Sequence, residues 1–235
     1  MTDLFKYAGD ELVLFQHARH WKKYFSRQIR PYITGNVLEV GAGMGATTLL
    51  LNDGTVDNWL MLEPDKQMSS IVKKKIETKE LPSNSRLQTG TIDQVSSGFD
   101  TIIYIDVLEH IETDAEEIKK AAALLTPGGH LIVLSPAFQS LYNPFDKAIG
   151  HHRRYNKKMF RALTPPGLQL LRSRYYDSVG YFAALINKLL LRRKYPTLRQ
   201  VLFWDNWLVP VSKITDNIFF HSFGKSIIGT WKKPG

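Results

Sequence analysis

Three alternating glycines stand at the end of an apolar strand pattern near the start of the chain. Gly41, Gly43 and Gly45 follow the mostly apolar strand pattern at 37–40. Glycine adopts left-handed dihedrals, so a strand-to-helix turn built from it presents the backbone itself as a binding surface. Glu63 lies about twenty residues further on, where the hydroxyls of a ribose need an acceptor. This spacing predicts a nucleotide-type cofactor site rather than an ordinary glycine-rich turn.

The glycines alone leave two cofactors open. The segment 41–46 also satisfies the dinucleotide pattern G-x-G-x-x-G/A, so an NAD-dependent oxidoreductase remains an alternative. Three features favour S-adenosylmethionine: Glu39 can order the turn and face a positively charged methionine portion, Asp93 can accept from an adenine amino group, and 99–111 carries polar residues from a strand into the ligand cleft.

Alternating strands and helices must position these residues. We predict strands at 37–41, 59–63, 86–91, 101–106 and 130–135, and helices at 46–51, 65–79 and 114–125. This alternation is typical of parallel crossovers, so the sequence predicts an α/β fold with a doubly wound, mostly parallel sheet.

We expect a single domain over 1–235 with three parts. An amphipathic helix over 10–32 gives an N-terminal helical lid at 1–34, and 35–135 forms the cofactor-binding core. The remainder, 136–235, contributes a substrate-side loop, a short helix near 157–163, a sixth strand near 168–176, a helical insertion at 179–220 and a last strand at 226–231.

Composition narrows the function classes. The chain of 235 residues has no cysteine, which excludes disulfides, thiolate metal sites and cysteine nucleophiles, and no metal site is predicted. Its opening residues show neither a signal peptide nor a membrane helix, so we expect a cytoplasmic protein. Residues 1–130 carry a net charge of −4 and residues 131–235 carry +13, so the second half either attracts an anionic small molecule, phospholipid headgroups or nucleic acid, or presents a solvated basic surface that aids solubility.

Four segments resemble the successive motifs of class I S-adenosylmethionine-dependent methyltransferases. They are 37–48, 61–65, 100–111 and 125–131, and the resemblance covers about two thirds of the chain. The D-V-L-E-H-I motif is similar to that of bacterial type 11 and type 12 methyltransferases, and G-H-x-R-R-Y at 150–155 is similar to a subgroup of them. The resemblance implies a seven-stranded Rossmann-like sheet with an antiparallel final strand, and S-adenosyl-L-homocysteine as product.

The same resemblance implies which residues bind the cofactor. It assigns residues to the methionine portion (Glu39, Gly41, Gly43, Gly45), the ribose (Glu63), the adenine (Ile92, Asp93) and the surface beneath the ligand (Asp106, Val107, Leu108). One departure is that the family's G-D-A segment reads Gly90–Asp93 here, which makes the assignment of Asp93 less secure than that of Glu63.

A loop rich in His, Arg and Tyr follows the fifth predicted strand. An imidazole suits removal of a hydroxyl proton near neutral pH, so His151 is the first candidate for a catalytic base, followed by His110 and Tyr155. Arg153 and Arg154 can hold a carboxylate or phosphate. Tyr142 and Asp146 complete the predicted substrate site. The alternative for the arginines is an ion pair with Asp146 or Asp106 that only holds the loop.

Aromatic residues at both ends of the chain allow two interpretations. Phe15, His17, Trp21 and Tyr24 either close over the ligands or pack in the core, and packing is favoured. The stretch 185–193, with Phe203, Trp204 and Trp207, forms an apolar substrate wall, a membrane-surface patch or part of the core, and packing is again favoured.

The sequence therefore predicts methyl transfer by in-line displacement to a small-molecule or glycan acceptor, including a lipid-linked one, at a hydroxyl. Peripheral membrane contact is compatible with the basic and apolar C-terminal third. RNA methylation is the rival, although 106–109 lacks the Asp/Asn-Pro-Pro-aromatic segment of amino-group methylases. A non-catalytic cofactor-binding protein is a further alternative. The acceptor and the oligomeric state stay open.

Overall fold

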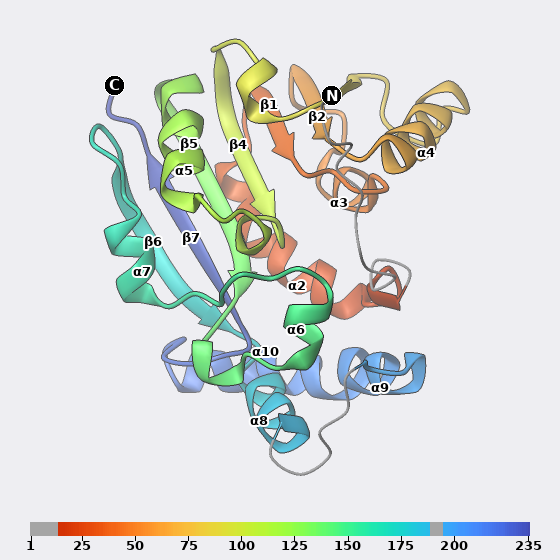
Figure 1. Ribbon diagram of the computed structural model, residues 1–235, viewed down its shortest axis with the longest axis vertical. Helices are drawn as coiled ribbons and strands as arrows, with labels where there is room; N and C mark the ends of the chain where they lie inside the picture. The colour runs from red at the N-terminus through yellow and green to blue at the C-terminus, as the bar shows by residue number, and fades with distance from the viewer. Residues whose placement is uncertain (1–13, 189–194) are drawn as a thin grey trace.

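A single seven-stranded sheet forms the centre of the protein. The computed structural model describes residues 14–188 and 195–235, and the strand order is β3-β2-β1-β4-β5-β7-β6 (Figure 1). The strands are β1 (Asn36–Val40), β2 (Asn58–Glu63), β3 (Ser85–Thr89), β4 (Phe99–Ile105), β5 (Leu125–Pro136), β6 (Gln169–Tyr176) and β7 (Ser226–Lys232). The first five pair in parallel and β7 runs antiparallel to both neighbours, which confirms the predicted fold class.

Helices connect the strands as the alternating pattern predicts. They are α2 (Arg19–Ile29), α3 (Ala46–Leu51), α4 (Lys66–Glu77), α5 (Asp114–Leu124), α6 (Pro144–Ala148), α7 (Lys157–Ala162), α8 (Ser178–Ile186), α9 (Leu198–Phe203) and α10 (Val209–Ile218). β1 lies between β2 and β4, so the chain reverses its direction of travel across the sheet there. Open α/β sheets bind ligands at the carboxyl ends of their strands beside such a point.

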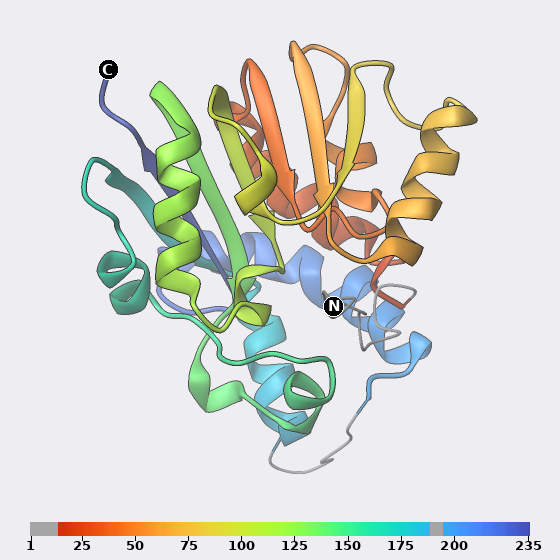
Figure 2. The same cartoon turned by 45° about the horizontal axis from the view of Figure 1, so that its top comes forward.

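Two apolar clusters fill the two faces of the sheet. On one face, Trp21 and Phe25 of α2 pack with Trp59 and with Trp204, which lies between α9 and α10. On the other face, Ile118 of α5 packs with residues of β4 and β5 and with the aromatic side chains around α7. Figure 2 shows α5 in front of the sheet and α10 behind it. The sheet is therefore covered on both sides, as a mostly parallel sheet requires.

The predicted N-terminal helix is interrupted in the part that the structure describes. Its first residues lie outside the described part of the chain, a turn interrupts it at residues 16–17, and α2 begins at Arg19. Trp21, Tyr24 and Phe25 are buried, and the Tyr24 hydroxyl donates to Asp216 Oδ2 at 2.9 Å. These aromatic side chains belong to the core, which was the favoured alternative to a lid.

The helical insertion before β7 is present as predicted. It comprises α8, α9, a π-helical turn Trp204–Leu208 and α10; residues 189–194, which include part of the predicted apolar stretch, lie outside the described residues. Within 14–188 and 195–235, no helix is long and apolar enough to span a bilayer.

Buried aspartates attach this insertion to the rest of the protein. Asp216 accepts hydrogen bonds from the backbone N–H groups of Asp177 and Ser178, and Asp205 accepts from those of His20 and Trp21. Backbone donors at helix ends need such acceptors when they are buried. The carboxylates therefore fix the insertion against α2 and β6.

Candidate functional site

The glycine turn after β1 has the conformation that the sequence predicts. Gly41, Gly43 and Gly45 all have positive φ angles, between 55° and 77°. A Cβ atom added at Gly41 would lie 2.5 Å from Val107 Cγ2, so glycine is required there by conformation and by space. β1 and β4 are neighbours in the sheet, so the turn after β1 packs against Val107 after β4 at the carboxyl end of the sheet.

Glu63 reaches this turn from the end of β2. Its Oε2 accepts from the Gly43 N–H at 2.7 Å and its Oε1 accepts from the Asp65 N–H at 2.9 Å. Burial raises the pKa of Glu63, against the effect of these two hydrogen bonds. The carboxylate thus lies beside the backbone surface at which the predicted ribose would bind.

Glu39 points into the protein rather than toward open space. Its Oε2 accepts from the Thr48 hydroxyl and from Trp59 Nε1, and the side chain is buried. Because Thr48 is in α3, the bond ties β1 to the helix on the far side of the turn. Burial raises the pKa of Glu39 to about 7. The structure places Glu39 where it orders the turn, while a direct contact with the methionine portion stays a prediction.

The predicted adenine residues lie in a short 3₁₀ turn after β3. Ile92 is buried in the apolar cluster on the α5 face. Asp93 is exposed and forms a 2.6 Å ion pair with Lys120 of α5. An adenine amino group would have to share the Asp93 carboxylate with Lys120. Among the described residues Ile92 has no such competitor, but its side chain is buried.

Asp106 follows β4 with φ 54°, a left-handed conformation that is costly for a residue with a side chain. The side chain is accessible, but the surrounding protein desolvates it enough to raise its pKa to about 6, against the opposing influence of His151, Lys225 and Lys22 nearby. Leu108 is fully buried in the core, so its contribution beneath the cofactor is limited to its backbone.

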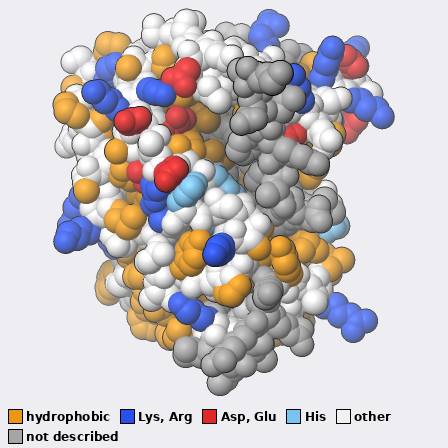
Figure 3. Space-filling model, viewed as in Figure 1, with side chains coloured by type: hydrophobic (Ala, Val, Ile, Leu, Met, Phe, Trp, Pro, Cys, Tyr) orange, Lys and Arg blue, Asp and Glu red, His pale blue; other side chains and the backbone are white. Residues whose placement is uncertain are grey.

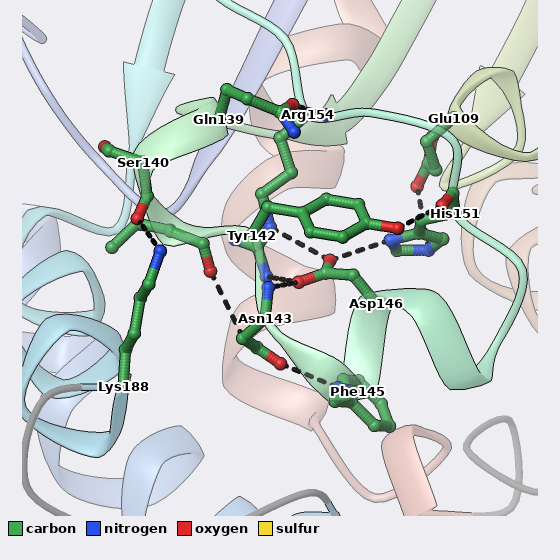
Figure 4. Close-up of polar contacts among 11 residues, drawn as sticks. Glu109, Gln139, Ser140, Tyr142, Asn143, Phe145, Asp146, His151, Arg154 and Lys188 are labelled. Carbon is green, nitrogen blue, oxygen red and sulfur yellow. Dashed lines mark hydrogen bonds and ion pairs between the residues drawn. The ribbon is translucent and has the colours of Figure 1, made fainter. Parts of the chain in front are cut away.

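His151 is held in a fixed orientation by Asp146. The Nδ1 atom of His151 lies 2.9 Å from Asp146 Oδ1, and the carboxylate also binds Arg154 through Nε at 2.9 Å and Nη2 at 3.0 Å (Figure 4). Although burial opposes it, the bonds from His151 and Arg154 hold the pKa of Asp146 below its usual range. This fixes the imidazole through Nδ1 and turns its Nε2 away from Asp146.

The remaining loop residues form internal contacts. Arg153 Nη1 pairs with Asp114 at 2.6 Å, and the buried Arg154 pairs with Asp146, which is the loop-holding alternative considered for the arginines. Tyr155 is buried, and its hydroxyl donates to Asp114 Oδ2 and to the Leu108 carbonyl. The Tyr142 hydroxyl donates to the His151 carbonyl at 2.6 Å. Direct substrate contacts by these residues stay predictions; their observed role is to shape the loop.

Glu109, His110 and His151 form a compact cluster that the sequence analysis did not assemble. One potential ligand atom from each lies within 4.8 Å of the other two. The rings of His110 and His151 are perpendicular with centroids 4.6 Å apart, and burial lowers the pKa of His110 to about 4. Histidine side chains lie next to acidic and basic ones near the middle of the face in Figure 3. The only sequence signal for this cluster is that Glu109 and His110 are both part of the fourth-strand motif.

Lys225 is a second residue that sequence reasoning missed. Its Nζ lies 3.6 Å from the centre of the Trp204 ring and 4.0 Å from Asp177 Oδ2. Burial lowers the pKa of Lys225, and its charge acts on Asp106. A lysine at the start of β7 thus adds positive charge to the carboxyl end of β4.

A surface hollow of about 650 Å³ lies along α6. Its lining consists of Tyr142, Asn143, Pro144, Lys147, Ala148 and Tyr195. The hollow belongs to the loop that carries His151 rather than to the glycine turn, and Lys147 is the charged residue among the described residues that line it.

Comparison with known proteins gives evidence on this site that is independent of its geometry. Residues 38–131 match the family model described as a methyltransferase domain. This segment contains the glycine turn, Glu63, the Asp93 region and the Asp106–Ile111 motif. No curated protein matches the sequence.

Solved structures extend the comparison to the whole chain. YcgJ from Bacillus subtilis is 16% identical, with coverage of 92% of this chain and 99% of that one and a TM-score of 0.60. An S-adenosylmethionine-dependent methyltransferase from Clostridium acetobutylicum is 14% identical, with 96% of each chain covered and a TM-score of 0.60. The N-methyltransferase NodS from Bradyrhizobium japonicum, solved with S-adenosyl-L-homocysteine, is 15% identical, with 97% and 94% covered and a TM-score of 0.61. These similarities establish the fold over nearly the full length.

Proposed function

We propose that this chain is a class I S-adenosylmethionine-dependent methyltransferase and that it methylates a hydroxyl of a small, glycan or lipid-linked acceptor; the match of residues 38–131 to a methyltransferase domain and the fold support the proposal. The observation that carries the proposal is the imidazole of His151, oriented by Asp146 at the carboxyl end of β4. The rest of the loop supports that orientation through Arg154.

The chemistry needs little beyond alignment and a proton acceptor. The acceptor oxygen attacks the sulfonium methyl group in line, an O–C bond forms, the S–C bond breaks, and neutral S-adenosyl-L-homocysteine leaves. The hydroxyl proton goes to Nε2 of His151, because Nδ1 faces Asp146. Asp146 remains ionised and stabilises the imidazolium, since its pKa is held below the usual range.

An exposed apolar stripe supports a lipid-linked acceptor. Along the continuous helix from α9 to α10, the large side chains Phe203, Trp207, Val211, Ile214 and Ile218 recur at intervals of three and four residues and are all exposed. Trp207 is 69% exposed and Ile214 is 65% exposed. The opposite side of the same helix packs on the core through Trp204 and Val209. An amphipathic helix of this kind can lie in a membrane interface.

Charge supports an anionic bilayer as the partner of this stripe. Residues 131–235 contain 17 Lys and Arg but four acidic residues, and all four are buried: Asp146, Asp177, Asp205 and Asp216. The surface of this half therefore offers no acidic side chain to repel phospholipid headgroups. In Figure 3, apolar side chains gather toward the end of the molecule at which α8 and α10 lie in Figure 1.

Vesicle sedimentation tests the membrane part of the proposal. We expect binding to vesicles that contain phosphatidylglycerol and weaker binding to phosphatidylcholine alone. The double variant Trp207→Glu/Ile214→Glu should lose at least about tenfold in affinity, because burial of one such side chain contributes roughly 1.5–3 kcal/mol. Ile71→Glu is the matched control, since Ile71 is an exposed apolar residue on α4. Equal binding by both variants would exclude the stripe.

The catalytic part is tested by transfer of a radiolabelled methyl group from S-adenosylmethionine into an extracted polar-lipid fraction. His151→Ala should lower turnover by about 10² or more while S-adenosyl-L-homocysteine affinity stays the same. His152→Ala is the control, because the neighbouring imidazole is exposed. Unchanged turnover in His151→Ala would remove this residue as base.

RNA methylation is the second candidate, favoured by the same basic surface. RNA affinity that falls steeply with salt, together with methyl incorporation into RNA and none into lipid, would replace the lipid-linked acceptor.

A further inference from the structure

Glu109 is a fully buried carboxylate that the protein leaves without a hydrogen bond. Among residues 14–188 and 195–235, neither Oε1 nor Oε2 has a hydrogen-bond partner. The nearest charged atom that the structure pairs with it is His151 Nε2, at 3.8 Å from Oε1, which is too long for a hydrogen bond. A buried, ionised carboxylate without partners is costly, and a bound cation would offset that cost.

Two imidazoles face the same point. His110, the next residue in the chain, and His151, from the loop after β5, bring ligand atoms within 4.8 Å of each other and of Glu109. In a tetrahedral zinc site with bonds of about 2.0–2.1 Å, ligand atoms lie about 3.3 Å apart, so a modest inward movement of each side chain would close the site.

The residues around the cluster show a second feature that is typical of metal centres. Imidazole ligands in metal sites hold their second nitrogen by a hydrogen bond to a carboxylate, which fixes the ring and its tautomer. Asp146 does this for His151 through Nδ1, and Arg154 and the Asn143 N–H in turn hold Asp146. This leaves Nε2 of His151 directed toward Glu109.

We propose that Glu109, His110 and His151 bind a divalent first-row transition metal ion such as Zn²⁺ at the substrate end of the site. Two imidazoles and one carboxylate suit such ions, whereas Mg²⁺ and Ca²⁺ prefer oxygen ligands alone. Three protein ligands leave a coordination position open for an oxygen of the acceptor.

The catalytic consequence rests on the proposed methyl transfer. A hydroxyl bound to the ion loses its proton to solvent more readily because the metal lowers its pKa. The resulting oxygen then attacks the sulfonium methyl group as the S–C bond breaks. Nε2 of His151 cannot bind the ion and accept the proton in the same turnover, so with metal bound the ion replaces the imidazole in activating the hydroxyl.

Titration of the EDTA-treated protein with Co²⁺, followed by its visible absorption, tests the site without acceptor or cofactor. We expect one Co²⁺ per chain with a band of low-symmetry coordination, displacement by Zn²⁺, and no displacement by Mg²⁺. Glu109→Gln should weaken Co²⁺ binding by more than about 100-fold, and Asp146→Asn by about 10- to 100-fold, the range for loss of a residue that orients a ligand.

His152→Ala is the matched control and should bind Co²⁺ as the wild type does, because His152 lies outside the cluster. His110→Asn gives a second arm if Glu109→Gln fails to fold. No Co²⁺ band in the wild type, or equal affinity in wild type, Glu109→Gln and His110→Asn, would overturn the metal site. Either result leaves the methyl-transfer test intact, since that test does not measure metal.

Discussion

The two halves of the chain differ in how fully their buried acidic residues are hydrogen-bonded. In the cofactor half, burial raises the pKa of Glu39, Glu63 and Glu109, and the Glu109 carboxylate lacks a hydrogen-bond partner among the described residues. In the second half, Asp177 and Asp216 each accept several hydrogen bonds from backbone and side-chain donors. Glu39 and Glu63 accept hydrogen bonds that order the glycine turn, and Glu109 alone of the three has no such donor in the described part of the chain, whereas Asp177 and Asp216 hold the helical insertion in place.

This difference also explains the surface charge. Because the second half places all four of its aspartates inside, its 17 basic residues are not offset by acidic side chains at the surface. The cofactor half has the opposite net charge and keeps acidic residues such as Glu112 and Glu116 exposed on the surface. A single fold thus separates a basic half suited to an anionic partner from the half in which we propose that a cationic sulfonium binds.

Removal of a structural aspartate should have the largest effect. Asp216→Ala leaves the buried N–H groups of Asp177 and Ser178 and the Tyr24 hydroxyl without their acceptor. Unfolding by urea should show a loss of about 3 kcal/mol or more. The exposed Asp57 provides the control, and Asp57→Ala should stay within about 0.5 kcal/mol of the wild type. Equal stability of the two variants would break the comparison.

Removal of the Glu39 charge should raise the free energy of unfolding at high pH, whereas Asp216→Ala lowers it. Its pKa is about 7 in the folded protein and near 4.5 when unfolded, so folding favours the protonated form. The associated stability is complete below pH 4.5 and is lost as pH rises through 7. Between pH 5 and pH 8 the cofactor-free wild type should therefore lose about 2–3 kcal/mol through this group.

Glu39→Gln should lack this loss, because an amide can still accept from Thr48 and Trp59 without ionising. Urea unfolding at both pH values measures the difference. Identical pH dependence in the variant and the wild type would show that Glu39 ionises as easily when folded as when unfolded.

The Glu63 carboxylate should matter for the cofactor more than for folding. Glu63→Ala removes the acceptor beside Gly43 that we assign to the ribose hydroxyls. We expect affinity for S-adenosyl-L-homocysteine to fall by about 10- to 30-fold, the loss of one charge-assisted hydrogen bond or more. Calorimetric titration measures it, and unchanged affinity would remove the ribose assignment.

The sequence predicts the fold well where local pattern and glycine chemistry determine it. The strands of the cofactor half end at the residues of the motifs. At these ends Gly41 lies against Val107, and Glu63 accepts a hydrogen bond from the Gly43 N–H. The last strand and the helical insertion also follow from their apolar patterns. These features depend on residues that are near one another in the chain or in register across the sheet.

The candidate site is less predictable because it depends on contacts between distant segments. The ion pair of Asp93 with Lys120 and the burial of Tyr155 against Asp114 cannot be read from spacing. The same holds for Lys225, which reaches the end of β4 from the start of β7. For Phe203, Trp204 and Trp207, the sequence favoured packing for all three, but the structure buries only Trp204. Helical spacing places apolar residues on two sides of the helix from α9 to α10, but it does not show which side packs against the core.

Calorimetric titration of the purified chain with S-adenosyl-L-homocysteine and, separately, with NAD tests the central claim most directly. The glycine turn, Glu63 and the family match predict one S-adenosyl-L-homocysteine per chain and no heat from NAD. Binding of NAD without any response to S-adenosyl-L-homocysteine would contradict the assignment of this protein as a methyltransferase.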